Sequence, residues 1–298
     1  MNMPLGLFVF FAALGVWFVL LVLGFKRRSF GPFVGFGIVF LVLMNVRYLI
    51  EGAPAAIAFF IGIYDVLDNL GLRAGEGAAA LATCPNNACS VWGNTYLIHP
   101  SWGTAFHARF LDAAGLRSTV LYAHLSFNSI VFVLMHVQLW RTGAGSHVAW
   151  HKIIGRVSFV FLTLGTASAL WLAASHGSVG EYGGNWSMVG FWSMSLFVYG
   201  CAVMGVLAIR KGDRVAHRIW MIRFVGSMWG AFWLFRVMLF VLGPLLRNYE
   251  AANILVCIWL SAPMGILIAE VVRRKLLDKR AEYRSGPVSA ERTFELAT

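Results

Sequence analysis

Long apolar runs are the feature that most constrains how this chain can fold. A helix of about 20 apolar residues crosses the hydrocarbon core of a bilayer and pairs its own backbone polar groups. Seven such runs occupy residues 4–25, 32–50, 118–140, 152–174, 187–209, 219–242 and 251–272. The sequence therefore predicts an all-α fold, a polytopic membrane helix bundle of about seven transmembrane helices.

The composition agrees with a membrane protein. Of the 298 residues, 59% are hydrophobic and 12% are charged. Soluble domains carry roughly 25% charged residues. The balance of residues excludes an ordinary soluble enzyme or binding module.

Basic residues indicate the orientation of the chain in the membrane. They concentrate in segments 26–31, 141–151, 210–218 and 273–298 and at the adjoining helix ends. Because loops rich in Lys and Arg stay in the cytoplasm, we expect the N-terminus outside and the C-terminus inside the bacterial cytoplasmic (inner) membrane. The net charge of +11 then reflects topology and contact with anionic membrane lipids, and no nucleic acid is expected as a partner.

The predicted spans divide the chain into four parts. Residues 1–50 hold two N-terminal transmembrane helices, 51–117 form an extracytoplasmic loop, 118–275 form a five-helix core, and 276–298 are a cytoplasmic tail. Within the loop, residues 54–72 favour a helix lying at the membrane interface. Cys84 and Cys89 flank a Pro-Asn-Asn turn, which predicts a disulfide in an oxidising compartment, with a thiol metal site as the alternative.

Polar residues within the spans are the candidates for function, because such residues are costly in a bilayer unless they have partners. His151 and His217 open two predicted helices that run in the same direction, so they lie at one depth. Two neutral imidazoles on facing helices can ligate a b-type haem. Arg156 and Arg223 would then pair with its propionates. The alternative is that both histidines lie at the lipid headgroups without a ligand.

Further polar residues form an inner and an outer layer. In the inner layer, Arg223 and Glu270 predict an intramembrane ion pair between the last two helices, or a proton-transfer site at Glu270. His136 falls near the same depth as a further ligand candidate. In the outer layer, His124 and Arg236 are candidates for binding a cofactor. The partners open to Arg236 are His124, backbone carbonyls, or a bound anion such as a quinone oxygen or a lipid phosphate.

The order and spacing of these residues resemble a bacterial integral-membrane family known only as a domain of unknown function. The resemblance covers residues 118–275 and brings no activity with it. The pattern comprises His124, Gln138, His151 through Arg156, His217 through Arg223, Arg236, Trp259, and Ala269 with Glu270. The histidines at the helix starts are more distantly similar to those of cytochrome b561-type haem proteins, which implies at most one haem, between His151 and His217.

Two functional hypotheses follow. The first is a membrane redox protein, an oxidoreductase component in electron transport that binds haem b and exchanges electrons with quinol or with a partner complex. The second is a non-enzymatic membrane subunit, transporter or assembly factor whose polar residues join helices, bind lipid or carry protons. The aromatic residues of loop 90–107 would dock the protein partner.

Overall fold

The described residues of the computed structural model are almost entirely helical. They comprise 5–27, 29–47, 49–50, 88–91, 94–97, 115–142, 148–176, 185–242 and 250–274. The elements are α1 (Leu5–Arg27), the helix Gly31–Arg47, α5 (Gly115–Thr142), α6 (Val148–His176), α7 (Asn185–Arg210), α8 (Arg214–Trp229), the π-helix η4 (Gly230–Leu234), α9 (Phe235–Leu242) and α10 (Glu250–Val272).

Five helices in this part of the chain are long and apolar enough to cross a membrane. They are Phe8–Arg27, Leu116–Leu139, Ala149–Ser175, Asn185–Arg210 and Leu255–Val272. The other two predicted runs correspond to the shorter helix Gly31–Arg47 and to the continuous series α8, η4 and α9. Large apolar side chains such as Phe18, Val160 and Leu267 are exposed on the helices, so the spanning helices contact lipid.

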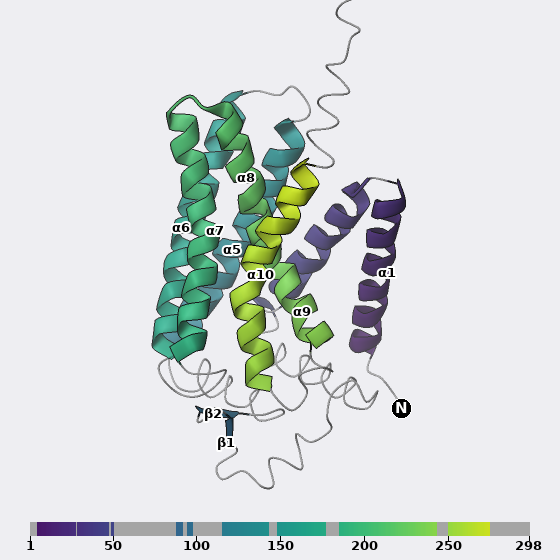
Figure 1. Cartoon of the computed structure of the whole chain (residues 1–298), viewed down its shortest axis with the longest axis vertical. Helices are drawn as coiled ribbons and strands as arrows, with labels where there is room; N and C mark the ends of the chain where they lie inside the picture. The colour runs from purple at the N-terminus through teal and green to yellow at the C-terminus, as the bar shows by residue number, and fades with distance from the viewer. Residues whose placement is uncertain are drawn as a thin grey trace, which may run out of the picture.

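The helices α5 to α8 and α10 form one bundle, with α1 standing to one side of it (Figure 1). Trp17 of α1 joins the N-terminal helices to the bundle. Its indole N–H donates to the Phe33 carbonyl at 3.1 Å, and its ring contacts those of Trp229 and Trp233 at 6.1 and 5.4 Å between centroids. Aromatic packing of this kind holds α1 and the helix Gly31–Arg47 against α8 and η4.

A short turn fixes α8 antiparallel to α7. Gly212 has a φ of +80°, a conformation that favours glycine, and the Asp213 side chain accepts the Ala216 N–H at 2.8 Å to cap α8. The starts of α6 and α8 and the end of α10 therefore meet at one end of the bundle, at the top of Figure 1. We call this the basic end, after the Lys and Arg residues there.

Glycine allows α10 to approach α8 and η4 at backbone distance. A Cβ added at Gly265 would lie 2.2 Å from the Gly226 carbonyl oxygen, and one added at Gly230 would lie 2.3 Å from the Ser261 carbonyl oxygen. Gly226 and Gly230 are four residues apart, the small-x-x-x-small spacing of close membrane helix pairs. This seam holds the last helix against the helix that carries His217.

The structure differs from the sequence prediction in two places. The predicted loop 51–117 contains a two-stranded antiparallel hairpin, β1 (Ala88–Val91) and β2 (Asn94–Leu97), because Val, Thr and Tyr favour paired strands. The predicted helix 219–242 is interrupted by η4, where the Phe235 N–H bonds five residues back to the Gly230 carbonyl. Cys84, the interfacial helix 54–72 and the tail 276–298 lie outside the described residues, so the disulfide stays a prediction.

Candidate functional site

His151 and His217 lie against each other at the basic end. Their ring centroids are 6.4 Å apart and the ring planes meet at 88°, edge to face. His151 comes from the first turn of α6, and His217 from the first turn of α8, where its N–H bonds to the Asp213 carbonyl at 3.0 Å. The capped turn before α8 thus sets the position of His217 opposite α6.

A backbone contact fixes the His217 ring. Its Nδ1 lies 2.8 Å from the Gly205 carbonyl oxygen of α7, and a carbonyl accepts, so Nδ1 carries the proton. Nε2 then has its lone pair free for a ligand. Ligating histidines commonly have this second bond, which sets tautomer and orientation.

His151 differs because its Nδ1 is buried and has no hydrogen-bond partner within the described part of the chain. Two other buried atoms share this property, Gln138 Nε2 on α5 and Ser158 Oγ on α6. Buried polar groups in proteins are nearly always hydrogen-bonded. A polar region with unmet hydrogen-bonding capacity therefore adjoins the histidine pair.

The two arginines predicted to hold propionates have different surroundings. Arg156 is exposed on α6. Arg223 packs its guanidinium 4.6 Å from the centre of the Trp220 ring, and its Nε lies 3.5 Å from Glu270 Oε2. Arg223 is thus engaged between α8 and α10, and Arg156 is the arginine that remains open to a ligand.

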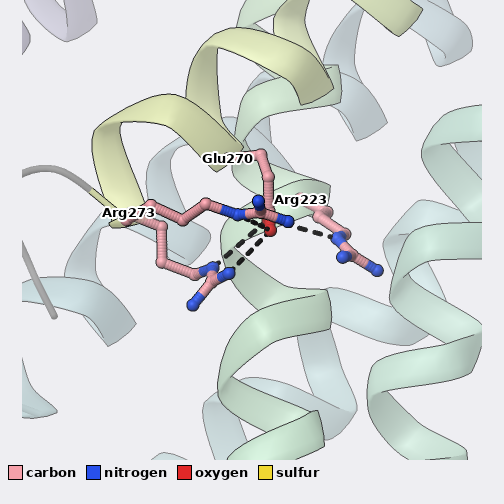
Figure 2. A network of polar contacts seen from close by, with 4 residues as sticks. Arg223, Glu270 and Arg273 are labelled. Atoms are coloured by element: carbon pink, nitrogen blue, oxygen red, sulfur yellow. Dashed lines mark hydrogen bonds and ion pairs between the residues drawn. The ribbon is translucent and has the colours of Figure 1, made fainter.

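Glu270 is the centre of a network of arginines (Figure 2). Arg273 donates to Oε1 at 2.6 Å and to Oε2 at 3.2 Å, and Arg274 donates to Oε1 at 3.1 Å. The Arg273 contact is the shorter and has two donors, so Arg223 is the weaker partner. A carboxylate surrounded in this way favours the ion-pair interpretation over proton transfer at Glu270.

His136 is not available as a further ligand. Its Nδ1 donates to the Phe132 carbonyl at 2.6 Å, and its Nε2 accepts the indole N–H of Trp229 at 2.9 Å. Both ring nitrogens are occupied, which corrects the prediction of a third inner ligand. His136 joins α5 to α8 through Trp229, a partner that spacing along the sequence does not reveal.

The two outer candidates are held by different helices. His124 Nδ1 lies 3.1 Å from the Gly165 carbonyl oxygen of α6, and Ser168 donates to the same oxygen at 2.8 Å. Arg236 on α9 donates to the Phe232 carbonyl of η4, so a backbone carbonyl is one partner of this arginine. The guanidinium is therefore directed toward η4 and away from the end of α9 at Leu242.

No group of three or more His, Cys, Asp or Glu side chains that could hold a metal ion occurs among the residues that the structure describes. A haem iron takes four of its ligands from the porphyrin, so it asks only two of the protein. His151 and His217 are two imidazoles 6.4 Å apart, the number of side chains that such an iron would need.

The comparisons with known proteins give a family. A family model described as "Predicted membrane protein (DUF2306)" matches residues 121–272, just over half of the chain, and spans His124 through Glu270. No curated protein and no solved structure matches the chain. Nothing in these comparisons supports the more distant resemblance to cytochrome b561-type proteins.

Proposed function

Because the chain belongs to the predicted membrane protein family DUF2306, whose description names no activity, we propose a function from the geometry of the site. The protein binds one b-type haem through His151 and His217 and transfers electrons in the bacterial cytoplasmic membrane, with its N-terminus outside. The observation that carries this proposal is the contact of the two imidazoles across α6 and α8 at 6.4 Å.

His151 and His217 would be the two residues that hold the haem iron, and the separation of their rings supports this. A metal–imidazole nitrogen bond is about 2.0 Å. Two such bonds, with the distance from each nitrogen to its ring centre added, would span roughly the observed 6.4 Å between centroids.

The chain's own residues would orient and neutralise the group. The Gly205 carbonyl holds His217 with Nε2 unprotonated, as a metal ligand must be. Arg156, Lys152 and Arg218 are exposed around the histidine pair and offer cations to the propionates. When bound, the haem supplies one-electron redox chemistry.

The proposal is tested by measuring the haem content of the purified wild type, of two alanine variants and of a control variant. We expect about one haem per chain in the wild type, and none in His151→Ala or His217→Ala. His136→Gln is the matched control, because the glutamine oxygen can still accept the Trp229 N–H. A folded wild type without haem, or haem retained in both alanine variants, would contradict the proposal.

A second candidate is a non-enzymatic membrane subunit that holds an anionic lipid. The observation that favours it is Arg236, an arginine in an apolar helical segment, which donates to the neutral Phe232 carbonyl of η4. Mass spectrometry of the protein in mild detergent should then find a lipid retained by the wild type and lost from Arg236→Gln. Equal lipid retention in the two proteins would exclude this role for Arg236.

A further inference from the structure

Three buried polar atoms without partners lie on α5 and α6 toward the basic end. They are Gln138 Nε2, His151 Nδ1 and Ser158 Oγ, and we call the three residues the inner polar cluster. The residues Gln138 and Ser158 are each only 8% exposed. Their hydrogen-bonding capacity is therefore unmet by solvent as well as by the described protein.

The spacing of the cluster residues places them along one face. His151, Gly155 and Ser158 follow the i, i+4, i+7 pattern of one helix face, so His151 and Ser158 are about 10 Å apart along α6. Gln138 lies opposite Gly155, where an added Cβ would be 3.2 Å from its Nε2. The glutamine amide thus lies against α6 between the levels of the other two residues.

An apolar layer limits the cluster on the side away from the basic end. Val131 and Met135 of α5 and Leu162 of α6 are 0, 2 and 2% exposed. This layer separates the cluster from the polar contacts of His124, Asn128 and Ser168 nearer the other end.

The chemistry of the cluster selects the ligand. A buried polar atom without a partner loses the free energy of its hydration and gains no hydrogen bond in return. Apolar residues of the same shape would avoid that cost. The Gln138 amide and the Ser158 hydroxyl are neutral donors, which suit a neutral carbonyl or hydroxyl oxygen better than a carboxylate or phosphate. Because the cluster lies within the predicted bilayer, the ligand needs an apolar body.

We propose that the inner polar cluster binds the ring oxygen of a membrane-soluble quinone or quinol, with Gln138 and Ser158 as its hydrogen-bond donors. His151 at the edge of the cluster joins this subsite to the pair that would hold the haem. The electron-exchange role of the quinone rests on the proposed function, whereas its binding does not require the haem.

Ligand-induced thermal stabilisation tests the proposal on purified protein in detergent, with a decyl-tailed benzoquinone as the probe. We expect the quinone to raise the Tm of the wild type. Gln138→Leu and Ser158→Ala should each weaken binding about tenfold, the loss of one buried hydrogen bond. Thr163→Ala is the matched control, because Thr163 is exposed on the same helix and its contacts, with the Phe159 carbonyl and the Tyr199 hydroxyl, involve no cluster residue.

The Tm values without quinone give an independent readout. Gln138→Leu and Ser158→Ala should be as stable as the wild type or more stable, since the replaced atoms have no partner to lose. A lower Tm of both variants without quinone would overturn the proposal. So would a quinone shift that is absent from the wild type, unchanged in both variants, or reproduced by decanol, which has the tail without the ring.

The haem proposal and the quinone proposal can fail separately. His217→Ala should lose haem and keep the quinone shift, because His217 is not a cluster residue. A wild type without haem whose quinone shift still depends on Gln138 and Ser158 would refute the haem and support the quinone subsite. A haem-loaded protein whose quinone-induced Tm shift is unchanged by Gln138→Leu and Ser158→Ala would refute only the quinone subsite.

Discussion

Replacing Gly265 with alanine should separate α10 from α8 and η4. The new Cβ would lie 2.2 Å from the Gly226 carbonyl oxygen and 2.8 Å from the Gly230 Cα. A carbon–oxygen contact needs about 3.3 Å, so the helices must move apart by about 1 Å. The contacting atoms belong to backbone on both helices, and no side chain can rotate away to relieve the overlap.

The expected cost follows from two opposing effects. Overpacking a close contact costs about 1–3 kcal/mol in free energy of unfolding, and more where backbone must shift. Alanine in place of glycine within a helix raises the free energy of unfolding by about 0.5–1 kcal/mol. We therefore expect Gly265→Ala to lower the free energy of unfolding by about 1–2 kcal/mol.

Reversible unfolding in mixed detergent micelles measures this change, with Gly200→Ala on α7 as the matched control. An added Cβ at Gly200 meets no atom within 4 Å, so the same substitution there should be neutral or stabilising. If Gly265→Ala is as stable as Gly200→Ala, the described approach of α10 to α8 is wrong.

Two further substitutions test the polar contacts by the same unfolding measurement. Trp229→Phe removes the donor to His136 and should cost about 1–3 kcal/mol, because the buried acceptor loses its partner; a neutral result would contradict the bond. Arg223→Gln should cost at most about 1 kcal/mol, since its ion pair is long and Arg273 still holds Glu270. Glu270→Gln weakens all the arginine contacts and should cost more than Arg223→Gln; the reverse order would contradict the network.

The sequence predicts the features that depend on local pattern. Apolar run length identifies the helices, and the position of His151 and His217 at helix starts predicts that they share one end of the bundle. Both follow from helix rise and bilayer thickness alone. That the two rings meet also needed the turn at Gly212 and Asp213, which sets α8 against α7.

Features that depend on tertiary packing were harder to predict. Glycines at 31, 35 and 37 resemble a packing motif, yet an added Cβ would meet neighbours only at Gly37, against Trp17 and Trp229. The seam that closes the bundle uses Gly226 and Gly230, whose spacing was a usable signal. The unpartnered atoms of the inner polar cluster have no signal in the sequence. Whether a buried polar atom finds a hydrogen-bond partner depends on how α5 and α6 pack.

The most direct test of the central claim, that His151 and His217 together hold a haem, is a reduced-minus-oxidised absorption spectrum of the purified wild-type protein. The account predicts the sharp bands of a low-spin haem with two histidine ligands, absent from His217→Ala. A flat difference spectrum from folded wild-type protein would contradict it.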